Sequence, residues 1–209
     1  MELTTIPRWT NRRELLDDCI AAGDTTAESG VDRGAFSREM LARNPRRHFA
    51  VDPYVDLHPG GIWQAGRLVG WRERFLDAHQ QFATDARVAF VRATSANFWR
   101  TCQPGEFDMV YLDGSHVLDA VRLDLRGAWR AVRPGGWITG HDWCDDIRVL
   151  PGVRVAVSEF AVAARVPVYL TDEPAVDPVW FAERLADFTV AYRSYAIRRD
   201  ERDSPFPQT

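Results

Sequence analysis

The chain has 209 residues, of which 45% are apolar and 27% charged, which suits one globular domain with a single sizeable core. All 26 basic residues are arginine because lysine is absent, and 30 carboxylates leave a formal net charge of -4. This acidic balance argues against a nucleic-acid partner held by a broad basic face. The absence of lysine excludes Schiff-base chemistry on a lysine and a P-loop.

The positions of the cysteines and the hydropathy of the chain exclude further classes of protein. Cys19, Cys102 and Cys144 lie far apart and form no CxxC pair, so we expect neither a disulfide framework nor a structural zinc site. The first residues lack the apolar segment of a signal peptide, and no stretch approaches the roughly 18 apolar residues of a membrane span. We therefore expect a cytoplasmic protein with no membrane partner, and exposed aromatic side chains leave a homodimer open.

Short apolar runs alternate with helical patterns along the chain, as in a sheet of buried strands joined by crossover helices. Strands are expected over residues 26–31, 48–54, 87–93, 108–112, 137–140, 166–171 and 178–185. Helices are expected over residues 35–43, 69–82, 117–132 and 153–164. The pattern predicts an α/β fold with a doubly wound, mostly parallel, seven-stranded Rossmann-like sheet in a single domain. We place this domain at 25–193, between an N-terminal helical extension (1–24) and a C-terminal tail (194–209).

The loop after the first expected strand contains an acid and two glycines, Glu28, Gly30 and Gly34. In a doubly wound sheet, ligands bind outside the carboxyl ends of the strands, where this loop lies. Gly30 allows a tight turn, and Gly34 allows a ligand or a helix to approach the backbone. By itself this pattern indicates only a strand-to-helix turn.

The second expected strand supplies an acid, Asp52, 24 residues after Glu28. A carboxylate at this place can accept hydrogen bonds from both hydroxyls of a ribose, which favours a nucleoside ligand. The glycine spacing departs from G-x-G-x-x-G, and the anionic Glu28 would repel a pyrophosphate. A nucleoside that carries a sulfonium and an ammonium group therefore suits this loop better than NAD.

Two further motifs follow the fourth and fifth strands: D-G-S-H at 113–116 and H-D-W at 141–143. With the runs at 27–41, 48–54, 107–143 and 151–161, they make the chain resemble a class I S-adenosylmethionine-dependent methyltransferase. More narrowly, the chain resembles a small bacterial group with D-G-x-H and H-D-aromatic motifs. The resemblance spans roughly residues 25–185 and is most specific over 107–143. It implies a Rossmann-like fold and S-adenosylmethionine as cofactor.

The resemblance also implies which residues contact the cofactor. It assigns the methionine part to Glu28, Gly30 and Gly34, the ribose to Asp52, the adenine to Thr94 and Ser95, and the vicinity of the methyl group to Asp113. Ser29 departs from the larger apolar residue that usually stands between the acid and the glycine, which leaves the local packing open.

The D-G-x-H motif has a structural and a functional interpretation. In the structural one, Asp113 caps the next helix and His116 lies in its first turn. In the functional one, both lie beside the transferable methyl group, and His116 deprotonates a substrate hydroxyl.

Strand order predicts that Asp142 and Asp113 emerge from neighbouring strand ends, where two carboxylates can hold a divalent ion such as Mg or Mn. His141 would be a third ligand, but it stands where related metal-dependent enzymes have an acid. Because imidazole binds Mg²⁺ poorly, either a softer ion binds or none is required. Without an ion, His141 becomes a rival to His116 as the general base.

These observations predict O-methylation of a small hydroxylated molecule by in-line methyl transfer with His and Asp assistance. Two alternatives remain: an NAD-linked oxidoreductase, and a nucleoside-cofactor-binding module without catalysis. The sequence does not specify the acceptor.

Overall fold

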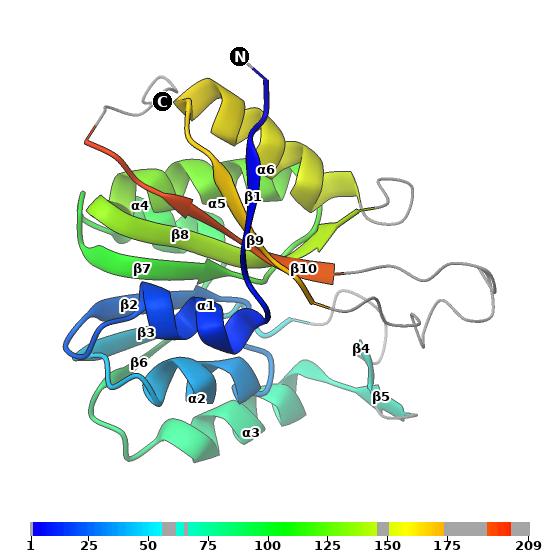
Figure 1. Cartoon of the computed structure of the whole chain (residues 1–209). Coiled ribbons are helices and arrows are strands. Elements are labelled where there is room, and N and C mark those ends of the chain that lie inside the picture. Colours follow the sequence, from blue (N-terminus) through cyan, green and yellow to red (C-terminus); the bar gives the residue numbers. More distant parts are fainter. Residues whose placement is uncertain (1, 56–61, 65–66, 146–150, 174–191, 202–209) are drawn as a thin grey trace.

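The computed structural model describes residues 2–55, 62–64, 67–145, 151–173 and 192–201, and its centre is one eight-stranded sheet (Figure 1). The strand order is β1-β9-β10-β8-β7-β2-β3-β6. Its members are β1 (Thr5–Trp9), β2 (Thr25–Ser29), β3 (Arg47–Val51), β6 (Val88–Val91), β7 (Phe107–Leu112), β8 (Val132–Cys144), β9 (Val168–Thr171) and β10 (Tyr192–Arg198). All run parallel except β10, which is antiparallel to both its neighbours.

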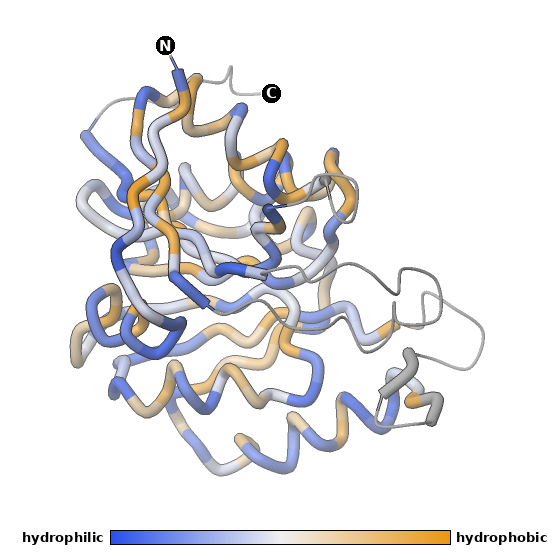
Figure 2. Tube along the Cα trace, turned by 45° about the vertical axis from the view of Figure 1, so that its right-hand side comes forward, coloured by the Kyte–Doolittle hydropathy of each residue, from blue (hydrophilic) through white to orange (hydrophobic). Residues whose placement is uncertain are grey.

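Helices cover both faces of this sheet (Figure 1). On one face lie α1 (Arg12–Cys19), α2 (Ala35–Leu41) and α3 (Trp71–Phe82), and on the other α4 (Ser95–Thr101), α5 (Leu118–Ala131) and α6 (Pro151–Ala164). Each layer buries apolar side chains against the sheet, and Figure 2 shows hydrophilic and hydrophobic residues alternating along α3, as expected for a helix with one buried face. Within the described residues, no helix is long and apolar enough to cross a membrane.

The predicted α/β fold with a mostly parallel Rossmann-like sheet is confirmed, with eight strands instead of seven. Two of the eight strands are not among the seven that the sequence predicts: β10, and β1, which lies within the segment 1–24 that we expected to be helical. Four of the five residues of β1 are exposed and one is proline, so its sequence lacks the apolar pattern of a buried strand. The expected strand at 178–185 lies outside the described residues, and β10 extends to Arg198, beyond the expected domain end at 193.

The sheet has its topological switch point between β2 and β7. The chain proceeds from β2 to β3 and β6 on one side, and from β7 to β8 on the other. Loops that leave these strands in opposite directions open a crevice at their carboxyl ends. A separate hairpin of β4 (Ile62–Gln64) and β5 (Arg67–Val69) lies beyond this edge of the sheet (Figure 1). The sequence-predicted site residues therefore lie at the edge where ligands bind in such folds.

Candidate functional site

The turn after β2 packs directly against the end of β7. Gly30 has φ +96°, and a Cβ built on it would lie 2.1 Å from the carbonyl oxygen of Asp113. The Asp113 backbone N–H donates to the Ser29 carbonyl at 2.8 Å, which joins the two strand ends. Gly34 has φ +79°, and its Cβ would lie 2.5 Å from the Phe82 ring of α3. Both glycines are therefore required by the fold, and Gly30 brings the glycine turn against Asp113.

Glu28 lies beneath this turn, where only 1% of its surface is exposed. Its Oε2 accepts a hydrogen bond from the Ser37 hydroxyl of α2 and lies 3.7 Å from His48 Nε2 of β3. The other ring nitrogen of His48, Nδ1, lies 3.0 Å from Thr26 Oγ1. The carboxylate therefore links β2, β3 and α2 directly under the glycine turn. Sequence reasoning did not identify Ser37 or His48, because their contacts join separate elements.

Asp52 directly follows β3, and both of its carboxylate oxygens accept hydrogen bonds from backbone N–H groups. Oδ1 accepts from the Tyr54 N–H at 2.7 Å, and Oδ2 accepts from the Asp32 N–H at 3.1 Å. Asp32 and Tyr54 both have positive φ, +49° and +46°. The buried Asp52 thus connects the loop after β3 to the glycine turn, and each oxygen keeps further lone pairs for a ligand hydroxyl.

Thr94 and Ser95 lie at the start of α4, a helix that we did not predict. Thr94 is the N-cap, and its hydroxyl accepts from the Asn97 N–H at 3.3 Å. The Ser95 hydroxyl forms a hydrogen bond with the Asp124 carboxylate of α5. Burial raises the pKa of Asp124, and this hydrogen bond opposes that rise. Both hydroxyls therefore have partners inside the protein, so a contact with adenine would have to use the backbone or the side-chain carbons.

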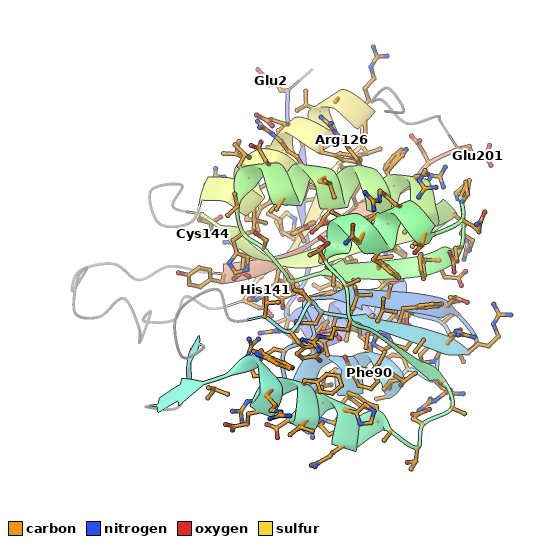
Figure 3. The ribbon with its side chains drawn as sticks, turned by 180° about the vertical axis from the view of Figure 1, so that it is seen from behind. Glu2, Phe90, Arg126, His141, Cys144 and Glu201 are labelled. Carbon is orange, nitrogen blue, oxygen red and sulfur yellow. The ribbon has the colours of Figure 1, made fainter. Side chains whose placement is uncertain are left out.

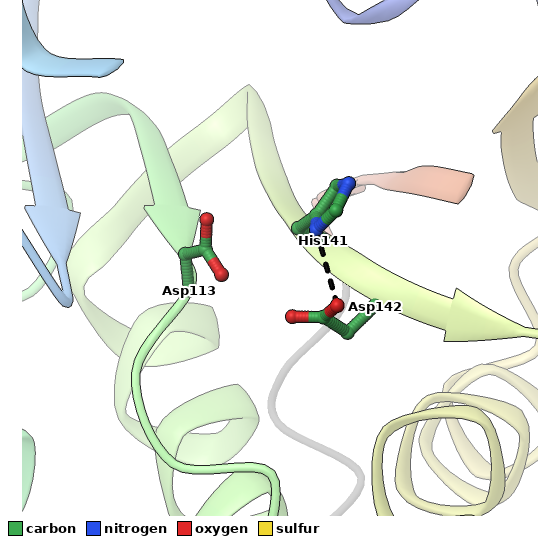
Figure 4. A group of neighbouring side chains, drawn as sticks. All are labelled: Asp113, His141 and Asp142. Carbon is green, nitrogen blue, oxygen red and sulfur yellow. Dashed lines mark ion pairs between the residues drawn. The ribbon is translucent and has the colours of Figure 1, made fainter. Parts of the chain in front are cut away.

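The ends of β7 and β8 bring Asp113, His116, His141 and Asp142 together. His141 lies at the carboxyl end of the sheet between the two helical layers (Figure 3). Its Nδ1 is 3.2 Å from Asp142 Oδ1, and His116 Nε2 is 2.8 Å from Asp142 Oδ2. Figure 4 shows the carboxylate of Asp113 facing the His141–Asp142 pair from the neighbouring strand. The first residue of α5 is Leu118 and its N-cap is Val117, so the alternative in which Asp113 caps this helix is wrong.

The charges of these four groups are strongly coupled. Burial raises the pKa of Asp113 to about 7, and the nearby Asp142 charge adds to that rise, while the two histidines oppose it. Burial would also raise the pKa of Asp142, but the hydrogen bonds from His116 and His141 and the charges of both rings together outweigh it and lower this pKa. The bond to Asp142 raises the pKa of His116. For His141, burial is the largest single influence and lowers the pKa, but the hydrogen bond to Asp142 and the charges of Asp142 and Asp113 together outweigh it and raise this pKa.

Three of these side chains could also hold an ion. One ligand atom each of Asp113, His141 and Asp142 lies within 4.8 Å of the others, and no other such group occurs among the described residues. Two carboxylates and one imidazole suit Mn²⁺ better than Mg²⁺, which prefers oxygen ligands. Both oxygens of Asp142 bind histidines, so the site is also complete as a hydrogen-bonded cluster.

The family model described as a methyltransferase domain matches residues 27–143, more than half of the chain. The chain therefore belongs to the methyltransferase family and is an enzyme that uses S-adenosylmethionine. This result excludes the NAD-linked and the non-catalytic alternatives. No curated protein matches the chain.

Solved structures share the fold at low sequence identity. Phosphoethanolamine N-methyltransferase 2 of Haemonchus contortus, in complex with S-adenosyl-L-methionine, is 12% identical, with TM-score 0.59 over 91% of this chain and 52% of that chain. The N-methyltransferase NodS of Bradyrhizobium japonicum is 15% identical, with TM-score 0.57 over 91% and 95%. A SAM-dependent O-methyltransferase of Thermotoga maritima is 19% identical, with TM-score 0.55 over 92% and 64%. The fold is thus shared by N- and O-methyltransferases and does not select the acceptor atom.

Proposed function

We propose that this enzyme methylates a hydroxyl group of a small molecule, with His116 as general base. The observation that carries the proposal is the bond of 2.8 Å between His116 Nε2 and Asp142 Oδ2 at the end of β8. An Asp–His pair fixes the ring and its tautomer, and a hydroxyl acceptor gains most from such a base because alcohols are weakly acidic.

The cofactor would lie along the switch point, with its ribose on Asp52 and its methionine part beside the glycine turn. The close approach of Gly30 to Asp113 supports this placement, because it brings the glycine turn directly against the end of β7. Glu28 acts from beneath, by holding the turn and by its negative charge. Thr94 and Ser95 border the adenine, and Asp113 lies near the methyl group.

S-adenosylmethionine supplies a methyl group on a sulfonium, and transfer breaks the sulfur–carbon bond, leaves its electron pair on sulfur and forms a bond between carbon and the acceptor oxygen. The protein must align the acceptor and remove its proton. His116 donates Nε2–H to Asp142, so the lone pair on Nδ1 receives that proton. The acidic Asp142 stabilises the resulting imidazolium. Alignment of bound reactants contributes on the order of 7–11 kcal/mol to lowering the barrier.

Metal assistance is a second candidate, which the proximity of Asp113, His141 and Asp142 favours. An ion there would withdraw charge from an acceptor oxygen and so acidify its hydroxyl. In that case Asp113 and Asp142 would act as ligands, with His141 as the third. If no ion binds, Asp113 and His141 instead affect the electrostatic environment of the base, His116. His141 Nε2 is then a competing proton acceptor.

Binding and turnover test separate halves of the proposal. Isothermal titration with S-adenosylmethionine should show binding to the wild type and a marked loss in Asp52→Ala. His116→Ala should still bind the cofactor but should not form S-adenosylhomocysteine with a panel of phenols, sugars and hydroxy acids. His79→Ala is the matched control, because His79 lies on α3 against Phe75 and Phe90. Absence of binding, or full turnover in His116→Ala, would contradict the proposal.

A further inference from the structure

Arg12, the first residue of α1, is held in place by a carboxylate that is anchored to the sheet. The Arg12 backbone N–H donates to Glu173 Oε1 at 3.1 Å, and the guanidinium Nε lies 3.6 Å from the same oxygen. The other oxygen, Oε2, accepts from the Thr171 hydroxyl at 3.0 Å and from the Ser194 N–H at 3.2 Å. Glu173 therefore connects Arg12 to the carboxyl end of β9 and to β10.

This position brings the guanidinium to the cofactor edge of the sheet. Its Cζ lies 5.7 Å from the ring centroid of Phe36, which follows the glycine turn by two residues. The Phe36 ring lies 4.0 Å from that of Tyr111 on β7. Burial raises the pKa of Tyr111, and the Arg12 charge opposes that rise. Burial and the Arg12 charge both act to lower the pKa of His141. Arg12 thus acts electrostatically on the ends of both β7 and β8.

A positive charge is needed at this edge if a carboxylate is to bind there. Glu28, Asp113 and Asp142 make the surroundings acidic, and acids repel a carboxylate at short range. Two other arginines near the glycine turn already pair with acids: Arg33 with Glu73 and Asp77, and Arg74 with Asp32. Among the described residues, the terminal nitrogens of Arg12 have no hydrogen-bond partner, and 41% of its side chain is exposed.

We propose that Arg12 binds the carboxylate of the methionine part of the cofactor, an inference that rests on the proposed function. If Asp52 holds the ribose at β3 and the methyl group lies at Asp113, the cofactor crosses the glycine turn from β3 toward β7. Its amino-acid end then lies on the side where α1 and α2 meet this edge. A guanidinium whose Nε side is held by Glu173 can offer its two terminal nitrogens to a carboxylate.

The test compares two ligands that differ only by the carboxylate: S-adenosylmethionine and decarboxylated S-adenosylmethionine. Both are titrated calorimetrically into the wild type, Arg12→Met and Arg13→Met. Arg13 is the matched control because it is the next residue of α1, is 71% exposed and pairs with Glu39 at 2.9 Å on the surface. Losing a charge-assisted bond should weaken S-adenosylmethionine binding to Arg12→Met by about ten- to a hundredfold. Binding of the decarboxylated ligand should change by less than about twofold, and Arg13→Met should match the wild type.

The decarboxylated ligand also reports whether the variant still forms its pocket. Arg12→Lys should recover part of the lost affinity, because it keeps the charge but not the planar fork. Equal losses of affinity for both ligands in Arg12→Met would mean that Arg12 has only a structural role. Unchanged affinities for both ligands would mean that Arg12 binds no part of the cofactor, for example because it binds an acidic acceptor. Either result overturns the inference. A wild type that binds neither ligand contradicts the proposed function instead.

Discussion

His116 Nε2 and Asp142 Oδ2 lie 2.8 Å apart, although His116 follows β7 and Asp142 lies near the end of β8. Asp142 has φ +61°, a left-handed conformation that is uncommon outside glycine. The strain is retained where both of its oxygens bind histidines. The hydrogen bonds to Asp142 act to raise the pKa of both rings.

Asp142→Asn should lower the pKa of His116, because the bond to Asp142 is the largest cause that raises it. A base works only when neutral, so the acidic limb of the pH–rate profile should move to lower pH, while the maximal rate falls because the ring is held less firmly. NMR titration of the histidine ring protons measures the first effect without any acceptor. His79 serves as the internal reference. An unchanged His116 titration would show that Asp142 does not control this ring.

Asp113→Asn should stabilise the chelator-treated protein at alkaline pH. Burial raises the pKa of Asp113 to about 7, whereas the unfolded chain has an ordinary value near 3.8. The folded state therefore loses stability as pH rises from about 4 to 7, and the full penalty persists above that range. The stabilising effect of the substitution should be larger at pH 8.5 than at pH 5 by roughly 2 kcal/mol. Chemical denaturation at both pH values checks this, and an equal effect at both would contradict it.

Gly30→Ala should be far more damaging than Gly34→Ala. The added Cβ at Gly30 meets the Asp113 backbone at 2.1 Å, so the end of β7 must move. At Gly34 it meets the end of the Phe82 ring at 2.5 Å, a side chain that can be trimmed. We expect a loss above roughly 3 kcal/mol for Gly30→Ala and roughly 1–2 kcal/mol for Gly34→Ala, with partial recovery in Gly34→Ala/Phe82→Leu. Urea denaturation ranks the three variants, and equal losses would refute the asymmetry.

Strand order explains how much of the site the sequence could predict. Asp52, Asp113 and Asp142 each follow an apolar run, and parallel strands bring their carboxyl ends to one edge. Strand order gives the positions of these residues but not their hydrogen-bond partners. Asp142 has a positive φ and contacts two histidines, and the buried Glu28 accepts a hydrogen bond from Ser37 of α2. These features arise from tertiary packing, which residue spacing does not encode.

Helix α4 and strand β1 are difficult to predict for a second reason: their sequences carry only weak signals of secondary structure. Thr94 caps α4, but that helix has only seven residues, too few for an apolar periodicity to be distinctive. Strand β1 is exposed along most of its length and is held by pairing with β9. Its segment places Arg12 at the cofactor edge, so a part of the chain outside the family match contributes to the proposed site.

The mixed ligand set of Asp113, His141 and Asp142 predicts a metal preference. An ion held there should be Mn²⁺ in preference to Mg²⁺, because imidazole favours softer ions. His141→Asp should shift the preference toward Mg²⁺ by supplying a third carboxylate, and Asp113→Asn should weaken both ions. Calorimetric titration of each ion into the chelator-treated protein measures this, with His79→Asp as the control for an added acid elsewhere. Mn²⁺ binding that persists unchanged in Asp113→Asn would place the ion outside this cluster. If the protein binds no Mn²⁺ at millimolar concentration, Asp113 and His141 act only through their electrostatic effect on His116 and Asp142.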